Sequence, residues 1–272
     1  MGNYKLIALD MDGTLLNSKK QIEMDSLNDI NNAVSNGKIV VLCTGRGKME
    51  IKEYRDQLSM VRYAILLSGA LIYDMKLNEA QYQKHLPEHC IERIIKVAEK
   101  YDGMLHYMNT EKSVVRKDQV NNMAAYQMAV YQEMFKRVAD PVDDIRKSIE
   151  ENDLPLKMLI YFRSAADRKN GLDELKELPL EFVFAENTSL EMTAKGVDKG
   201  DGLKRLAGYL NIPMNEAVAI GDAPNDTQML KAAGYAIAMK NASDDIKAIC
   251  DYETEDNDHN GVGKAIRNIL MN

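Results

Sequence analysis

The first third of the chain alternates short apolar runs with one longer helical pattern. Residues 5–9, 38–43 and 63–67 are apolar and rich in β-formers, and each run is followed by a polar or glycine-containing turn. Such runs are typical of buried parallel strands. Between the first two, apolar residues recur at helical spacing over residues 27–34, and Gly37 follows as a usual end of a helix. This order predicts a strand–helix–strand unit of a parallel sheet.

The same order returns near the C-terminus. Helical patterns over residues 203–210 and 227–233 alternate with strand-like apolar runs over residues 217–220 and 235–238. Alternating strands and helices indicate a parallel sheet with helices on its faces. Both ends of the chain are therefore expected to contribute to one doubly wound, Rossmann-like α/β core.

The middle of the chain has a different pattern of hydrophobic and polar residues. Residues 87–101 carry apolar side chains on one helical stripe. The runs at 104–108 and 114–116, split by a polar turn, predict a hairpin, and two further strands are predicted at 157–162 and 181–184. This mixture is typical of an α+β domain.

The positions at which this hydrophobic pattern changes give the expected domain boundaries. We expect residues 1–84 and 191–272 to form the α/β core, and residues 85–190 to form an inserted α+β domain. A chain of 272 residues is long enough for both.

Composition and charge narrow the class of protein. With 45% hydrophobic and 28% charged residues, the chain has a globular composition. The longest mostly apolar stretch, residues 63–73, is far shorter than the roughly 20 residues that span a bilayer, and the apolar run at 6–9 is too short for a signal peptide. We therefore expect a cytoplasmic protein. The net charge of −7 argues against a nucleic-acid partner.

Polar side chains of matching chemistry follow the predicted strands. The first strand runs into DMDGT at 10–14, and the strand at 217–220 runs into GDAPND at 221–226. Thr44, Gly45 and Arg46 follow the second strand, and their hydroxyl, flexible turn and guanidinium suit phosphate oxygens. In open α/β sheets, functional residues lie just beyond the carboxyl ends of the strands. These groups are therefore well placed for one site.

A fourth polar group opens a predicted helix. Lys199 and Gly200 stand at its start, where backbone N–H groups and the helix dipole favour an anion. Alone, such a lysine is usually a solvated surface charge. Together with the two acidic turns and the Thr44 turn, it indicates a site for a small phosphate.

The four groups resemble, in chain order, the four motifs of the haloacid dehalogenase superfamily of phosphotransferases. The inserted middle domain resembles the large C2B-type cap of the Cof-type sugar phosphatases in that superfamily. The segments LCTGR, SGALIYD, GVDKGDGL and GYAIAMKNA, and the turn at 258–262, are also similar to that family. The resemblance thus extends along nearly the whole chain.

The resemblance implies a role for each motif residue. Asp10 would be the nucleophile that forms an aspartyl phosphate, and Asp12 would be the general acid and then the general base. Asp10, the backbone carbonyl of Asp12 and Asp222 would hold Mg²⁺. Asp226 would orient Lys199 or the waters of the metal. The expected phosphate ligands are the backbone amides near Met11 and Gly45 and the side chains of Thr44, Arg46, Lys199 and Asn225.

The implied activity is that of a Mg²⁺-dependent phosphatase, a phosphoric monoester hydrolase. Its partner would be a small phosphorylated metabolite: a hexose or pentose phosphate or, as for some Cof-type relatives, flavin mononucleotide or pyridoxal phosphate. The inserted domain would close over the pocket and present specificity residues, for which Glu191, Asn187, Tyr107 and Arg116 are candidates.

Two alternatives stay open at this point. A phosphomutase of the same superfamily has the same four motifs and transfers the phosphoryl group to a second hydroxyl instead of water. A binding protein would have kept the pocket and lost turnover. The oligomeric state cannot be read from the sequence.

Overall fold

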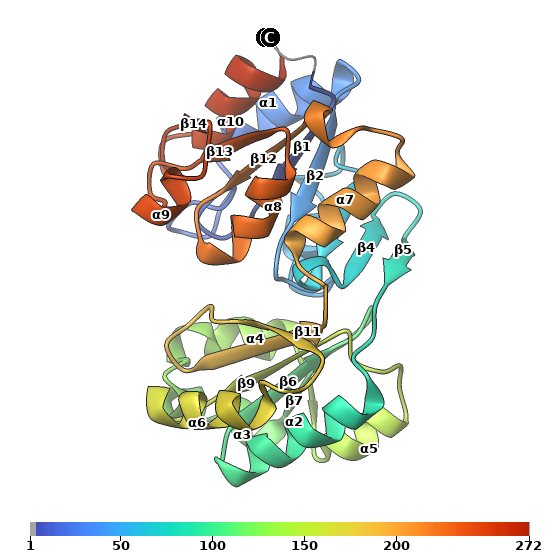
Figure 1. Ribbon diagram of the computed structural model, residues 1–272, viewed down its shortest axis with the longest axis vertical. Coiled ribbons are helices and arrows are strands. Elements are labelled where there is room, and N and C mark those ends of the chain that lie inside the picture. The colour runs from blue at the N-terminus through green and yellow to red at the C-terminus, as the bar shows by residue number, and fades with distance from the viewer. Residues whose placement is uncertain (1–3, 272) are drawn as a thin grey trace. The chain divides into compact units, whose positions relative to one another are not determined.

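The computed structural model describes residues 4–271, so residues 1–3 and 272 of the predicted core lie outside the description (Figure 1). The chain divides into two compact units. Unit 1 comprises Met1–Gly45, Glu53–Tyr82 and Asp198–Asn272, and unit 2 comprises Arg46–Lys52 and Gln83–Val197.

Unit 1 is built on a sheet with the strand order β14-β13-β12-β1-β2-β3-β4-β5. The parallel part of the sheet contains β1 (Leu6–Leu9), β2 (Ile39–Cys43), β3 (Tyr63–Leu66), β12 (Ala217–Gly221), β13 (Tyr235–Ala238) and β14 (Tyr252–Glu253). At the other edge, β4 (Leu71–Asp74) runs antiparallel to β3, and β5 (Glu79–Gln83) follows it. Every residue of β1 and β12 is buried, which explains their continuous apolar sequence.

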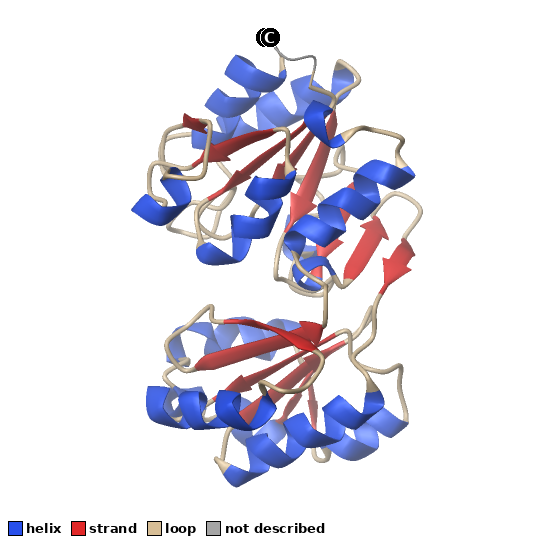
Figure 2. Cartoon of the chain, in the orientation of Figure 1, coloured by secondary structure: helices blue, strands red, loops and turns tan. Residues whose placement is uncertain are grey.

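Helices pack on the sheet of unit 1, as Figure 2 shows. The α-helices are α1 (Met24–Ser35), α7 (Lys199–Tyr209), α8 (Thr227–Ala232), α9 (Asp244–Lys247) and α10 (Gly261–Ala265). Leu203 and Leu206 of α7 and Met229 of α8 share a core cluster with Leu6 and Ala8 of β1. Helix α1 packs against β2 and α10. The predicted doubly wound α/β fold is confirmed.

Shorter helical turns complete unit 1. They are Lys52–Tyr54 at its margin, Leu67–Gly69, Met214–Glu216, Pro224–Asp226 and the π-helical turn Ile266–Leu270. The turn Leu67–Gly69 needs its glycine: Gly69 has a φ of +101°, and a Cβ there would lie 2.1 Å from the backbone oxygen of Asp198. This close approach packs the turn after β3 against the start of α7.

Unit 2 has a mixed, mainly antiparallel sheet with the strand order β10-β11-β9-β6-β7-β8. Its strands are β6 (Met104–Met108), β7 (Ser113–Arg116), β8 (Asp140–Val142), β9 (Lys157–Tyr161), β10 (Leu180–Val183) and β11 (Ser189–Ala194). Strands β6 and β7 are antiparallel neighbours, which confirms the predicted hairpin. The strands predicted near residues 157–162 and 181–184 are present as β9 and β10.

The core of unit 2 lies between this sheet and its helices. The α-helices are α2 (Glu88–Lys100), α3 (Lys117–Val120), α4 (Gln132–Val138), α5 (Ile145–Glu150) and α6 (Ala165–Leu175), with 3₁₀ turns at Met123–Tyr126 and Ala129–Tyr131. The apolar stripe of α2, including Ile91 and Ile94, packs with Leu105, Met158 and Leu190 of the strands. Burial of this stripe is the reason that the segment is helical.

The limits of unit 2 differ from those expected from the sequence. The expected boundary at residue 190 lies inside β11, which pairs with both β9 and β10 and therefore stays whole in unit 2. The segment Arg46–Lys52 also groups with unit 2, although it follows β2 of unit 1. Hydrophobic periodicity could not reveal this grouping, because it depends on contacts between distant segments.

Asp74, at the end of β4, holds the turn between β4 and β5 in place. Its side chain is fully buried, and its Oδ1 accepts hydrogen bonds from the backbone N–H groups of Lys76 and Leu77, each at 3.0 Å. Its Oδ2 accepts a hydrogen bond from Arg62 Nε at 2.8 Å. Burial alone would raise the pKa of Asp74, but the Leu77 N–H and the Arg62 guanidinium outweigh it and hold the pKa below its ordinary value.

We expect Asp74→Asn to lower the free energy of unfolding by about 1–3 kcal/mol near neutral pH, because a charge-assisted buried network is weakened. Since the pKa of Asp74 is depressed in the folded state, the advantage of the wild type is present above the unfolded pKa of about 3.9 and is lost as the pH falls through the folded pKa. Urea unfolding of both proteins at neutral and acidic pH measures this. A difference that does not shrink on acidification would contradict the role of the charge.

Candidate active site

The structure gathers four of the predicted groups at the carboxyl edge of the unit 1 sheet. Asp10 follows β1, Thr44 follows β2 and Asp222 follows β12. Strand β1 lies between β12 and β2, so Asp10 stands between the other two. Lys199 is the first residue of α7 and reaches the same place. The chain thus converges there from segments that are far apart in sequence.

Lys199 is the centre of this arrangement. Its side chain is 1% exposed, and its Nζ lies 2.5 Å from Asp10 Oδ1 and 2.6 Å from Asp226 Oδ1. A buried ammonium needs such partners, because burial without them is costly. Although burial lowers the pKa of Lys199, the charges of Asp10 and Asp226 outweigh it and raise the pKa above its ordinary value. Lys199 is therefore a fixed cation.

Asp226 uses both of its carboxylate oxygens. While Oδ1 pairs with Lys199, Oδ2 accepts hydrogen bonds from the backbone N–H groups of Asp222 at 3.0 Å and Ala223 at 3.1 Å. One buried side chain therefore fixes both the lysine and the turn that carries Asp222.

The carboxylates are crowded beyond what one lysine can neutralise. Burial, followed by the charge of Asp226, raises the pKa of Asp10 well above its ordinary value, against the opposing effect of Lys199. Burial also raises the pKa of Asp222 to about 6, opposed by a hydrogen bond from Thr14. Both shifts reflect negative charge held away from water, which a second cation would stabilise.

The donor set fits a divalent cation. One carboxylate oxygen from each of Asp10, Asp222 and Asp226 lies within 4.8 Å of the others. Asn225, in the same turn, has a buried side-chain oxygen that finds no hydrogen-bond partner among residues 4–271. Carboxylate and amide oxygens are hard ligands of the kind that Mg²⁺ prefers.

The loop after Asp10 is held in place by residues from distant segments. Gly13 has a φ of +85°, and a Cβ there would lie 2.3 Å from Asp222 Oδ2, so only glycine fits. Thr14 Oγ1 donates to Asp222 Oδ1 at 2.7 Å. Asn241 Nδ2 donates to the Gly13 carbonyl oxygen at 2.8 Å, and Asn257 Nδ2 donates to that of Leu16 at 2.9 Å.

Three residues that hold this loop are not predicted from the sequence: Thr14, Asn241 and Asn257. Thr14 lies inside the DMDGT motif, so the motif itself was a usable signal. The asparagines carry no local signal, because Asn241 is 228 residues away from the glycine that it holds.

The predicted phosphate ligands lie in both units. Thr44 is buried, its backbone N–H donates to the Ile65 carbonyl oxygen at 2.9 Å, and its own carbonyl oxygen accepts from Ser68 N–H at 3.1 Å. Met11 is fully buried directly after Asp10. Arg46 belongs to unit 2, where its Nη1 donates to the Glu50 carbonyl oxygen at 3.4 Å.

The candidate specificity residues of unit 2 have different environments. Glu191 pairs with the buried Lys157 at 2.6 Å. Arg116 pairs with Asp118, and Asn187 is exposed in the turn between β10 and β11. Tyr107 is fully buried in the helix-side core, and its hydroxyl contacts Ser148 Oγ at 2.7 Å. The expectation that Tyr107 meets substrate is therefore wrong, because β-strand alternation turns it toward the core.

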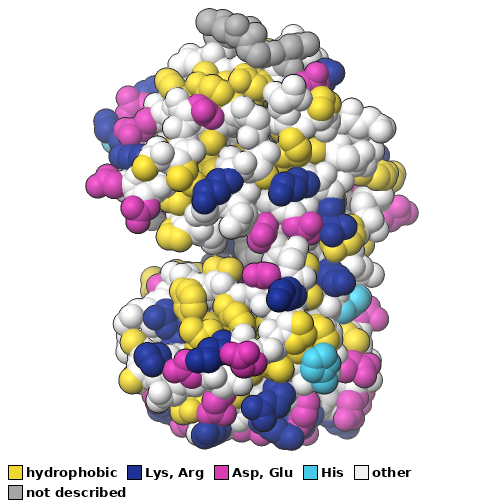
Figure 3. All heavy atoms as spheres, viewed as in Figure 1, with side chains coloured by type: hydrophobic (Ala, Val, Ile, Leu, Met, Phe, Trp, Pro, Cys, Tyr) yellow, Lys and Arg dark blue, Asp and Glu magenta, His cyan; other side chains and the backbone are white. Residues whose placement is uncertain are grey.

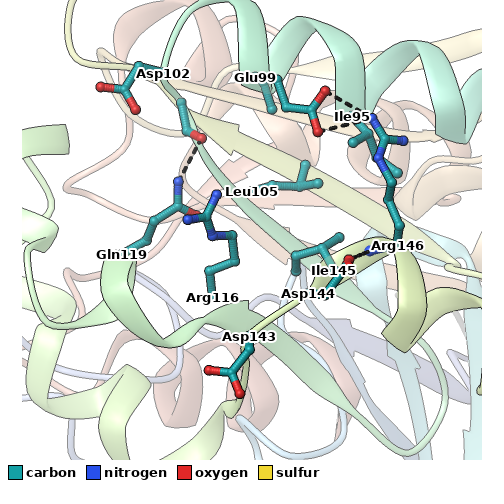
Figure 4. Close-up of a pocket in the computed structure, with 12 residues that line it drawn as sticks. Ile95, Glu99, Asp102, Leu105, Arg116, Gln119, Asp143, Asp144, Ile145 and Arg146 are labelled. Atoms are coloured by element: carbon teal, nitrogen blue, oxygen red, sulfur yellow. Dashed lines mark hydrogen bonds and ion pairs between the residues drawn. The ribbon is translucent and has the colours of Figure 1, made fainter.

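A separate cavity of about 460 Å³ lies within unit 2, lined by parts of α2, β6, α3 and α5 (Figure 4). Its charged groups are already paired: Arg146 contacts both Glu99 oxygens, at 2.9 and 3.0 Å. The amide nitrogen of Gln119 donates to the Gly103 carbonyl oxygen at 3.1 Å. The cavity thus lacks the convergent, uncompensated acids that distinguish the edge of the unit 1 sheet.

On the face of the molecule that Figure 3 presents, Lys and Arg side chains are interspersed with Asp and Glu. In the part of the chain that the structure describes, no helix combines the length and the apolar character needed to cross a membrane.

The chain is similar in sequence and fold to known proteins. Phosphatase YwpJ of Bacillus subtilis is 31% identical to the chain, over 98% of this chain and 100% of its own length. The 5-amino-6-(5-phospho-D-ribitylamino)uracil phosphatase YcsE of the same organism is 31% identical, over 99% of this chain and 97% of its own. The crystal structure of a haloacid dehalogenase-like hydrolase from Bacteroides thetaiotaomicron superposes with a TM-score of 0.87 at 28% identity, covering 98% of this chain and 99% of that chain.

The family model of the haloacid dehalogenase-like hydrolases matches residues 7–266, which include every motif described above. The resemblance inferred from the four strand-end and helix-start motifs is thus confirmed, and the chain belongs to the haloacid dehalogenase-like hydrolases.

Proposed function

We propose that the protein is a Mg²⁺-dependent phosphatase that hydrolyses small phosphomonoesters through an aspartyl-phosphate intermediate. The observation that carries the proposal is the buried Lys199, held between Asp10 and Asp226 at the sheet edge that also carries Asp222 and Thr44. Relatives named as phosphatases support the reaction class. The name of YcsE describes a phosphorylated ribityl compound, which favours a sugar-like phosphate as substrate here.

Asp10 is the proposed nucleophile. Lys199 contacts its Oδ1, so Oδ2 is the oxygen proposed to attack phosphorus. The new bond joins Asp10 to phosphorus while the ester P–O bond breaks, and the alcohol leaves with a proton from Asp12. Water then attacks the phosphorus of the aspartyl phosphate, gives a proton to Asp12 and releases phosphate. Asp10 returns as a carboxylate.

The proposed metal ligands are the side chains of Asp10 and Asp222 and the backbone carbonyl of Asp12. Bound there, Mg²⁺ would neutralise charge on the carboxylates and the phosphate and orient the phosphate for attack. We assign Asp226 to positioning instead, because Lys199 and two backbone N–H groups already occupy its oxygens.

The charge that develops on the phosphoryl oxygens needs fixed donors. Lys199 supplies a buried positive charge, and we propose that the Thr44 hydroxyl, the Asn225 side chain and the backbone amides near Met11 and Gly45 supply hydrogen bonds. Arg46 stays a prediction from the sequence motif.

The first experiment measures phosphate release from a panel of hexose and pentose phosphates, flavin mononucleotide and pyridoxal phosphate, with and without Mg²⁺. We expect Asp10→Asn to fold like the wild type and to lose more than about 10³-fold in turnover, because no other group at the site replaces the nucleophile. Substantial turnover by Asp10→Asn would contradict the mechanism.

Phosphoryl transfer to a second sugar hydroxyl without release would indicate a phosphomutase, and binding without turnover would indicate a binding protein.

A second prediction concerns the metal. Chelation by EDTA should abolish phosphate release, and added Mg²⁺ should restore it. In Asp222→Asn, the Mg²⁺ concentration for half-maximal activity should rise by more than about tenfold, because the site loses one charged ligand. A Mg²⁺ titration of both proteins measures this. Activity that survives EDTA, or an unchanged Mg²⁺ requirement in the variant, would argue against the proposed ligand set.

A further inference from the structure

A second lysine contacts the acidic edge of unit 1 from outside. Lys20 Nζ lies 2.8 Å from Asp12 Oδ1, and both side chains are partly exposed, at 52% and 42%. Neither the four motifs nor the proposed reaction assigns any role to Lys20. Its partner, however, is the residue that the proposed mechanism uses to move protons.

The backbone of Lys20 is held firmly. It has a φ of 58°, its N–H donates to the Asn17 carbonyl oxygen at 2.9 Å, and its carbonyl oxygen accepts from the Tyr54 hydroxyl at 3.0 Å. The Asn17 side chain accepts from the N–H groups of Lys19 at 3.0 Å and Gln21 at 2.9 Å. These contacts therefore hold the backbone of Lys20 in one conformation, from which its side chain reaches Asp12. That conformation is left-handed, which is uncommon for lysine.

Lys199 and Lys20 contact different carboxylates at this edge. Lys199 contacts Asp10 and Asp226. Lys20 supplies its positive charge to Asp12 from the solvent side, with Nζ at 2.8 Å from Oδ1. This contact limits the positions that the Asp12 carboxyl can take.

We propose that Lys20 is a positioning residue that holds the Asp12 carboxyl where it exchanges a proton with the leaving alcohol. This inference rests on the proposed function. Without Lys20, Asp12 would spend more time in other rotamers, and proton transfer to the alcohol would become slower. An exposed ion pair contributes little to stability, so Lys20→Met should unfold at the same temperature as the wild type.

The experiment compares two substrates that differ in their need for an acid. An alkyl phosphate that the wild type hydrolyses releases an alcohol that must be protonated, whereas p-nitrophenyl phosphate releases a stable phenolate. We expect Lys20→Met to lower kcat/KM for the alkyl phosphate by roughly tenfold, a part of the ~10²–10⁴-fold effect of general acid–base catalysis, and for p-nitrophenyl phosphate by less than about twofold. Lys20→Arg should restore most of the loss.

Matched variants make the result specific. Lys19→Met removes an exposed charge from the same turn and should leave both values unchanged. Asp12→Asn should show the same substrate-selective loss as Lys20→Met, only larger. The double variant should lose no more than Asp12→Asn, because Lys20 acts through Asp12.

Three outcomes would overturn the inference. An equal loss on both substrates would mean that Lys20 acts on phosphate binding and not through Asp12. Unchanged or increased kcat/KM in Lys20→Met would mean that the ion pair has no role or restrains the acid. If the wild type itself releases no phosphate from any substrate, the proposed function fails first, and this is seen before any variant is compared.

Discussion

The buried ammonium of Lys199 is the constraint on which the rest of the site depends. A cation that is 1% exposed must be neutralised locally, and Asp10 and Asp226 do this from two different segments. Breaking such a buried pair by removing one partner typically costs about 3–5 kcal/mol. The end of β1, the start of α7 and the turn after β12 are therefore tied to one another through a single side chain. The same contacts place a positive charge beside the proposed nucleophile.

Asp226 extends this constraint to the proposed metal ligand. Its second oxygen accepts hydrogen bonds from the backbone N–H groups of Asp222 and Ala223. The position of this turn therefore depends on the ion pair between Asp226 and Lys199. Gly13 then lies so close to Asp222 that no side chain fits between them. Groups locked in this way need little reorganisation when charge develops on a bound phosphate, which is the physical basis of electrostatic catalysis. The crowded, buried carboxylates are unfavourable for the protein alone, and the proposed cation would stabilise them.

The two units differ in what their polar groups do. In unit 1, charged side chains converge at one sheet edge with an excess of acids. In unit 2, the charged groups are mostly compensated, as Arg146 with Glu99 and Lys157 with Glu191 show. The proposed chemistry therefore depends on unit 1. Unit 2 is an α+β unit whose sheet carries the ion pair between Lys157 and Glu191.

The sequence by itself determined the parallel strands, the helices between them and the residues that follow each strand, because burial on both faces imposes continuous apolar runs and chain order fixes what comes next. It thereby predicted that Asp10, Thr44 and Asp222 share one edge, and its motifs predicted the family. For Asp226 the sequence left two partners open, and the tertiary structure pairs it with Lys199. The tertiary structure alone decided that Lys20 meets Asp12 and that Asn241 meets Gly13. It also buried Tyr107 and placed Arg46 in unit 2. Hydrophobic periodicity is a local property of the sequence. The partners of buried polar groups, in contrast, come from distant segments that approach each other only when the chain folds.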